Sequence, residues 1–286
     1  MSKILTSGIL YVVGTPIGNL EDMTLRGIRI LKEVDLIAAE DTRHTGKLLH
    51  HFQIETPQIS YHEHNQNHRT LELLTKLQEG TKIALVSDAG MPGISDPGYL
   101  LIKEAIALSL EVVPIPGVSA GVTALVVSGL TTDRFVFEGF LTAKGQTRKT
   151  HLQAIAKETK TLIFYEAPHR LLTTLKDLAI ALGESRKIVL ARELTKIHEE
   201  IWRGDIAGAI SLYSGERQPR GEYTLVVAGA ANARDISLSE SQVKEEFQQL
   251  LKQGLTRSQA SRHLAKLSAL SRQEIYQLTL ELNNLE

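Results

Sequence analysis

The sequence contains no cysteine among its 286 residues. This absence excludes disulfide bonds, thiolate nucleophiles, iron–sulfur clusters and cysteine-based zinc sites. Neither sign of charge dominates, because 32 Lys and Arg residues stand against 33 Asp and Glu residues. A chain so close to neutral is not a polycation, so any nucleic-acid surface must be a local patch.

Long apolar runs are also absent, since none approaches the ~18 residues that span a bilayer. The apolar run at residues 9–13 is too short for a signal peptide, and no A-x-A cleavage pattern follows it. We therefore expect a cytoplasmic protein without a membrane partner.

Several cofactor and metal signatures are missing. No G-x-G-x-x-G segment follows an expected strand and no G-x-x-x-x-G-K-[ST] segment occurs, which removes the basis for a Rossmann dinucleotide site or a P-loop. The sequence has no H-E-x-x-H segment. His62, His64 and His68 come nearest to a ligand cluster, but no carboxylate pattern accompanies them, so we expect no metal site.

Short apolar runs alternate with segments of helical spacing, which is typical of α/β proteins. Strands are expected at residues 9–13, 36–39, 83–86, 135–141, 162–165, 188–191 and 223–227, and helices at 71–80, 99–110, 119–130 and 170–182. Asp96 is expected to cap the helix at 99–110, with Pro97 as its first residue. Pro114 and Pro116 would disrupt a central strand and so close the first half. We therefore expect two α/β domains, at residues 1–116 and 117–231.

The remaining residues, 232–286, have a purely helical pattern and are expected to form a small domain similar to a helix-turn-helix. Ser239/Gln242, Thr256/Gln259 and Ser271/Glu274 each match the S/T-x-x-E/Q capping box. Five basic and no acidic residues lie between Lys252 and Arg272. They form either an ordinary solvated face or a surface for RNA phosphates, with the contacts expected at Arg257, Arg262 and Lys266.

The segment from Ser87 to Gly98 is the densest in Gly, Pro and Asp. It follows one expected strand and precedes a helix, and loops at the carboxyl ends of parallel strands are where α/β proteins bind ligands. Its glycines permit close backbone approach. Asp88 and Asp96 would repel a phosphate, so this loop favours a ligand of cationic or hydroxyl-rich character.

Three other polar loops are expected at the same edge of the sheet, at residues 14–20, 40–43 and 61–65. The first offers substrate-binding candidates at Thr15, Pro16 and Asn19. The other two supply candidates for a general base, and one cation that can steady a phosphate. These catalytic candidates are Glu40, Asp41, His62, Glu63 and the cation Arg43.

The segment at residues 117–121, GVSAG, fits the G-x-S-x-G nucleophile elbow of α/β-hydrolases, with Asp133 and His169 following it. Two prolines crowd the strand that should lead into the elbow, and no oxyanion loop precedes it. The same segment also fits a Pro-Gly turn that opens a helix, whose free N–H groups and Ser119 hydroxyl bind a ligand. A serine hydrolase remains a minor alternative.

Seven segments occur in order that together resemble the tetrapyrrole-methylase superfamily, in particular its ribosomal RNA methyltransferase branch. They are GTPIGNL at 14–20, EDTR at 40–43, SDAGMPGISDPG at 87–98, PGVSA at 116–120, FYEAPHR at 164–170, ARELTKIHEE at 191–200 and GEYTLVV at 221–227. Ser87-Asp88-Ala89 stands where tetrapyrrole enzymes have Gly-Asp-Pro. This departure counts against a porphyrinoid substrate.

The resemblance implies two α/β domains with S-adenosyl-L-methionine in the cleft between them. It also implies a homodimer and methylation of a cytidine ribose 2′-oxygen in small-subunit (16S) ribosomal RNA. By motif position the cofactor residues are Asp88, Ala89, Gly90, Gly93, Ile94, Ser119, Ala120 and Tyr165. A small-molecule tetrapyrrole methyltransferase and a non-catalytic ribosome-binding factor remain open as alternatives.

Overall fold

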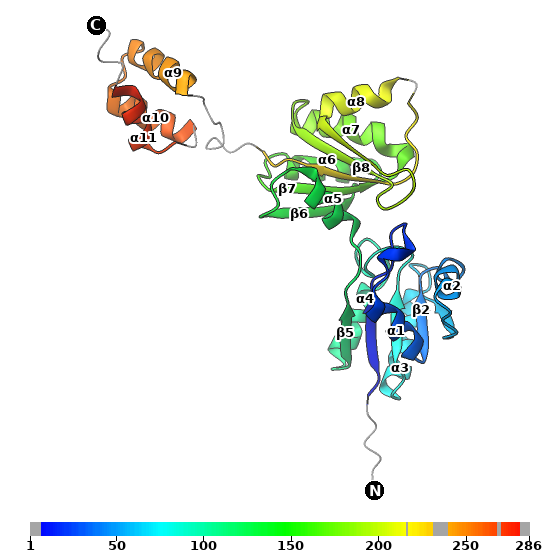
Figure 1. The fold of residues 1–286 in the computed structure, drawn as a ribbon. Coiled ribbons are helices and arrows are strands. Elements are labelled where there is room, and N and C mark those ends of the chain that lie inside the picture. The colour runs from blue at the N-terminus through cyan, green and yellow to red at the C-terminus, as the bar shows by residue number, and fades with distance from the viewer. Residues whose placement is uncertain (1–6, 216, 231–239, 268–269, 281–286) are drawn as a thin grey trace.

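A computed structural model of the chain describes residues 7–215, 217–230, 240–267 and 270–280. Its first sheet is wholly parallel, with strand order β3-β2-β4-β1-β5 (Figure 1). The strands are β1 (Ile9–Val13), β2 (Leu36–Ala39), β3 (Gln58–Ser60), β4 (Ile83–Val86) and β5 (Glu111–Ile115). Since all five run the same way, the loops after β1, β2, β3 and β4 meet at one edge of the sheet.

Helices cover both faces of this sheet. They are α1 (Leu25–Glu33), α2 (Thr42–His51), α3 (Gln66–Gln78) and α4 (Tyr99–Ala107). Residues from α1 and α2 pack with one face of the strands, and residues from α3 and α4 pack with the other. All four residues of β4 are buried, as expected for a continuous apolar strand covered on both sides.

The second sheet is mixed, with strand order β6-β7-β10-β8-β9. Its strands are β6 (Phe135–Phe140), β7 (Thr161–Glu166), β8 (Lys187–Arg192), β9 (Glu200–Asp205) and β10 (Tyr223–Val227). Only β6 and β7 pair in parallel; the other three pairings are antiparallel.

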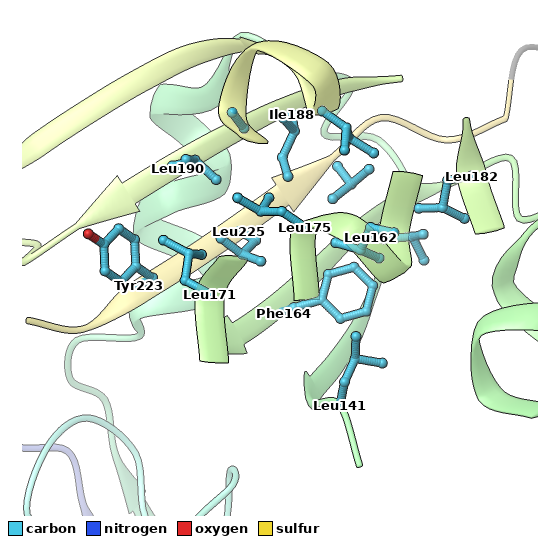
Figure 2. Close-up of a cluster of buried hydrophobic side chains, with 14 of the residues drawn as sticks. Leu141, Leu162, Phe164, Leu171, Leu175, Leu182, Ile188, Leu190, Tyr223 and Leu225 are labelled. Atoms are coloured by element: carbon cyan, nitrogen blue, oxygen red, sulfur yellow. The ribbon is translucent and has the colours of Figure 1, made fainter. Parts of the chain in front are cut away.

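Four further helices accompany the second sheet. They are α5 (Ala120–Ser128), α6 (Gln146–Ile155), α7 (Pro168–Leu182) and α8 (Ile206–Ser214). Ala124 and Leu125 of α5 pack on one face of the sheet. Figure 2 shows the core on the opposite face, where Leu171 and Leu175 of α7 meet Phe164 and Leu225.

Three helices follow, α9 (Glu240–Lys252), α10 (Arg257–Leu267) and α11 (Arg272–Leu280), and they share a small core around the fully buried Phe247. Two expected capping boxes are confirmed. The Thr256 and Ser271 N–H groups donate to the side chains of Gln259 (2.9 Å) and Glu274 (2.6 Å), whose own N–H groups donate back to the two hydroxyls. The third expected box begins at Ser239, which lies outside the described residues.

The expected helix cap at Asp96 is wrong. α4 begins at Tyr99 after Gly98, whose φ of +142° only glycine readily adopts. Pro97 is not helical either. The Asp96 side chain is therefore not used as a helix cap, and it lies among the site residues described below.

Gly14, after β1, and Gly117, in the segment that connects the two sheets, touch backbone to backbone. A Cβ atom on Gly14 would lie 2.6 Å from the Gly117 Cα, and one on Gly117 would lie 2.7 Å from the Gly14 Cα. Real Cβ atoms do not approach other atoms so closely, so both positions require glycine. This contact sets where the second sheet begins relative to the first.

We predict that Gly14→Ala lowers the free energy of unfolding by about 1–3 kcal/mol, because the added methyl group overpacks the Gly117 crossing. Urea denaturation followed by circular dichroism measures it. Gly215→Ala is the matched control, because Gly215 has a φ of −94° and no atom within 4 Å of a built Cβ. Equal stability of the two variants would contradict the proposed constraint.

Candidate functional site

The loop after β1 is fastened to the Ser87–Gly98 loop. The Thr15 N–H donates to the Gly90 carbonyl at 2.9 Å, the Gly90 N–H donates to the Thr15 carbonyl at 3.0 Å, and the Thr15 hydroxyl donates to the Ser87 carbonyl at 3.1 Å. Thr15 and Pro16, two substrate candidates, are both buried. Thr15 thus holds the glycine-rich loop in place.

The loops after β2 and β4 are tied by carboxylates that accept backbone hydrogen bonds. Glu40 Oε2 accepts from the Asp88 N–H at 3.2 Å, and Asp88 Oδ1 accepts from the Asp41 N–H at 3.1 Å. Burial raises the pKa of Glu40, and the neighbouring Asp88 and Asp41 raise it further. Two of the sequence candidates, Glu40 and Asp88, therefore order the site.

Asp41 and Arg43 form a pair at the start of α2. Asp41 Oδ1 accepts from the Arg43 backbone N–H at 2.8 Å, and Asp41 Oδ2 lies 2.7 Å from Arg43 Nη2. Both hydrogen bonds hold the pKa of Asp41 well below its usual range. A carboxylate of such low basicity is a weak proton acceptor at neutral pH. The Arg43 side chain is 88% exposed and accessible to a ligand.

A cavity of about 280 Å³ lies where the two sheets approach each other. Six of the eight residues assigned to the cofactor by motif position line it, namely Ala89, Gly90, Ile94, Ser119, Ala120 and Tyr165. Gly90 has a φ of +81°, and a Cβ there would lie 3.4 Å from the Val118 carbonyl oxygen. Asp88 and Gly93 are not among the lining residues; the Gly93 N–H instead donates to the Pro97 carbonyl.

Tyr165, on β7, organises the second-domain side of this cavity. Its hydroxyl accepts a hydrogen bond from the Gly121 N–H at 3.2 Å and another from Ser119. Burial raises the pKa of Tyr165, and its ring packs edge-on against Phe137 and Phe140. The Ser119 hydroxyl therefore contacts a phenol instead of an imidazole base, which does not fit a hydrolase nucleophile.

Sequence reasoning missed several lining residues. Met91, Ser95 and Asp96 belong to the loop already singled out, whereas Phe140, Leu194 and Thr224 come from the second sheet and its loops. Burial, together with the charges of Glu40 and Asp88, raises the pKa of Asp96 to about 7. The sequence indicated two roles for Asp96, a helix cap and a carboxylate that favours a cationic or hydroxyl-rich ligand, but Asp96 was not among the residues assigned by motif position.

The remaining candidates are not among the residues that line this cavity. Asn19 caps a short 3-10 helix at Leu20–Asp22 through its side-chain oxygen. His62 Nε2 lies 3.2 Å from Asn65 Nδ2, and His62 Nδ1 is buried without a hydrogen-bond partner. Glu63 is exposed and lines a second cavity, beside Asp96. The described part of the chain holds no group of three or more His, Asp or Glu side chains able to bind a metal ion.

The three basic candidates of the C-terminal helices differ in environment. Arg257 donates to the Thr279 carbonyl at 2.7 Å and lies over the Phe247 ring, so it ties the three helices together. Arg262 is exposed on α10. Lys266 belongs to α10 as well, but its side chain lies outside the described residues. Across those residues, no helix is long and apolar enough to cross a membrane.

Comparison with known proteins agrees with this architecture. The sequence model of the tetrapyrrole (corrin/porphyrin) methylase family matches residues 9–209, and the chain belongs to this family. Curated relatives named ribosomal RNA small subunit methyltransferase I include one from Synechocystis sp., 58% identical over 96% of this chain and 98% of its own length. One from Bacillus subtilis is 46% identical over 94% of this chain and 93% of its own length.

Solved structures share the fold at low identity. Diphthine synthase has a TM-score of 0.61 at 14% identity, and covers 77% of this chain and 90% of its own. Uroporphyrin-III C-methyltransferase from Thermus thermophilus, solved with S-adenosyl homocysteine, has a TM-score of 0.55 at 18% identity, with 77% and 97% covered. The α/β fold class and the family resemblance are thus confirmed.

S-adenosyl-L-methionine, the expected cofactor, is confirmed as the methyl donor of this family. The residues in the cavity fit such a molecule. Gly90 leaves its wall without a side chain, and Ile17, Ile94 and Leu194 give it an apolar surface. Carboxylates at the adjoining edge suit the positive charges of the amino and sulfonium groups.

We predict that Gly90→Val weakens S-adenosyl-L-methionine binding by more than about tenfold, or 1.4 kcal/mol, because the added side chain enters the cavity. Isothermal titration calorimetry measures the affinity, and circular dichroism checks the fold. Gly183→Val is the matched control: Gly183 also has a positive φ, +95°, but no atom within 4 Å of a built Cβ. Unchanged affinity in a folded Gly90→Val protein would remove the loop from the cofactor site.

Proposed function

We propose that this chain is an S-adenosyl-L-methionine-dependent methyltransferase that methylates the 2′-oxygen of a cytidine ribose in small-subunit ribosomal RNA, in the cytoplasm. The observation that carries the proposal is the 58% identity to a ribosomal RNA small subunit methyltransferase I over 96% of the chain. That match covers 96% of the chain, so it extends beyond residues 9–209, which match the family model.

Methyl transfer to a ribose hydroxyl requires an aligned methyl donor and a proton acceptor. Bound S-adenosyl-L-methionine supplies an already activated methyl group, so the cavity mainly has to align it with the acceptor oxygen. A ribose hydroxyl is a poor nucleophile at neutral pH, so a proton acceptor beside it accelerates the transfer. The edge loops offer the carboxylates of Glu40 and Glu63 for this role, with His62 as a further candidate. Asp41 is the weakest of the candidates, because its pairing with Arg43 lowers its basicity. The exposed Arg43 can contact a neighbouring phosphate.

RNA contact is assigned to the C-terminal helices. Lys252, near the end of α9, and Arg262, on α10, are exposed. The region from Lys252 to Arg272 carries no acidic residue, so its potential is locally positive within a nearly neutral chain. Arg257 serves the packing of the three helices first, and is the weaker of the candidates for phosphate contact.

We also propose that the protein forms a homodimer. Helix α5 exposes three valines, Val122 at 49%, Val126 at 66% and Val127 at 40%, although its other face is buried against the second sheet. Contiguous apolar side chains at a surface are typical of a protein interface. A second copy of the chain is the partner proposed for them.

The direct test is methyl transfer to small ribosomal subunits purified from cells that lack this protein. With tritiated S-adenosyl-L-methionine, the protein is expected to label the RNA of these subunits, and nuclease digestion is expected to place the label on a cytidine ribose. Subunits from cells that contain the protein are the control and should accept little label. Label on protein, on a base or on no ribosomal component would contradict the proposal.

We predict that Lys252→Gln combined with Arg262→Gln weakens binding to small ribosomal subunits and lowers the logarithmic salt slope by about two, roughly one unit for each lost phosphate contact. Filter binding over a range of salt concentrations measures both values. Lys176→Gln, an exposed site on α7, is the control and should bind as the unmodified protein does. An unchanged salt slope in the double variant would assign the helices to another task.

A further inference from the structure

The loop that joins β6 to α6 begins beside the first cavity. Phe140, the last residue of β6, lines that cavity, and the next residue, Leu141, is buried in the core of the second sheet (Figure 2). A Cβ on Gly139 would lie 3.2 Å from Ser95 Oγ, so the end of β6 also touches the glycine-rich loop of the first domain. Ser95 lines both cavities. Residues 142–147, which are all exposed, therefore leave the protein surface next to both.

Two arginines hold the start of this loop by its backbone. Arg148 Nη1 donates to the Thr142 carbonyl at 2.8 Å, and Arg170 Nη2 donates to the Leu141 carbonyl. The Arg148 side chain is only 7% exposed, and its Nε donates to Asp177 Oδ2 at 2.7 Å. Two successive carbonyl groups are thus fixed from beneath by guanidinium groups of α6 and α7.

The same arginines are linked to the wall of the first cavity. Arg148 Nη2 donates to the Thr174 hydroxyl at 2.9 Å, and that hydroxyl donates to Glu166. Glu166 lines the cavity, and its carboxylate lies 3.5 Å from Arg170 Nε. Apolar residues of similar volume often stabilise a protein as well as a buried ion pair does, whereas a planar guanidinium holds its partners in fixed directions. The network therefore fixes the geometry of the exposed loop relative to the cavity.

The surface that this loop forms with the start of α6 carries positive charge. No acidic residue occurs at residues 139–157. The neighbouring carboxylates are engaged, because Glu138 lies 2.7 Å from His151 Nε2 and Asp177 pairs with Arg148. Uncharged polar and lysine side chains are those that commonly contact nucleic-acid phosphates. The exposed side chains of this type at residues 142–150 are Thr142, Lys144, Gln146, Thr147, Lys149 and Thr150.

We infer that residues 142–150 bind the RNA backbone beside the target ribose, with Lys144 and Lys149 in contact with phosphates and Arg148 and Arg170 as positioning residues. This assignment rests on the ribose methylation proposed above. Phosphate contacts carry no sequence information, but they fix the register and orientation of the nucleic acid. A backbone held next to both cavities brings one ribose to the methyl donor, and such alignment is what the transfer requires.

The test compares Lys144→Gln combined with Lys149→Gln, and the matching pair of Lys→Arg changes, with the unmodified protein. Methylation of small ribosomal subunits that lack the methyl group gives kcat and KM, and filter binding gives the salt slope. The Gln pair is expected to raise the KM for subunits about fivefold or more and to lower the salt slope by about two. The Arg pair keeps both charges and should behave as the unmodified protein does. Lys157→Gln, exposed beyond the other end of α6, is the control.

The positioning role is tested with Arg148→Met, which removes the grip on the Thr142 carbonyl, while Glu166 keeps its pairing with Arg170. This change is expected to raise the KM for subunits although Arg148 is buried. Adding Lys144→Gln to it should raise KM by less than the product of the two single effects, since residues that act through one another are not additive. The lysine variants lie at the surface, so they test the binding surface even where Arg148→Met fails to fold.

Three results would overturn the assignment. They are a KM and a salt slope of the Gln pair equal to those of Lys157→Gln, a rise in KM explained by lost calorimetric affinity for S-adenosyl homocysteine, and attachment to ribosomal protein instead of RNA when Lys144 is replaced by a photoreactive amino acid and irradiated on the subunit. If the unmodified protein labels no ribosomal RNA, the proposed function itself fails. The binding and cross-linking measurements need no methyl transfer, so they identify that failure separately.

Discussion

The site depends on the backbone contact between Gly14 and Gly117. Gly14 ends the first strand of the first sheet, and Gly117 lies in the segment that leads to α5 and the second sheet. Because both residues lack a Cβ, the two chain segments can touch. Thr15, which follows Gly14, exchanges two backbone hydrogen bonds with Gly90. This contact thus fixes the relative positions of the loop after β1, the Ser87–Gly98 loop and the segment that leads to the second sheet. The first cavity lies among these three segments.

The carboxylates at the edge of the first sheet have different structural roles. Glu40 and Asp88 each accept a backbone N–H from a neighbouring loop, and Asp41 caps α2 while it pairs with Arg43. Asp96 is the carboxyl that burial and its neighbours bring to a pKa of about 7. Groups of one chemical type therefore differ in basicity because their surroundings differ.

Much of the fold could be predicted from local pattern. The strands at β1, β2, β4 and β10 were expected with the bounds that the structure has, because short apolar runs between turn residues carry a strong signal. β9 and α2 were not expected, since β9 is an edge strand with few apolar residues and α2 has a sequence rich in His and Thr. The limits of the three domains, at 116 and 231, stay a prediction.

For the site, the motif segments predicted six residues that line one cavity. They could do so because the loops that follow parallel strands lie at one edge of the sheet. The sequence analysis counted Asp96 among the carboxylates of the ligand loop without naming it as a site residue, and it gave no signal for Phe140. Their place depends on the turn at Gly98 and on the packing of the second sheet against the first, neither of which has a local signature.

Ribose methylation of ribosomal RNA by this chain is tested most directly by a map of 2′-O-methylated riboses in the ribosomal RNA of cells with and without the protein. If the proposed function holds, one cytidine in small-subunit RNA loses its methyl group when the protein is removed and regains it when the protein is restored. An identical map in both kinds of cell would contradict the proposed function.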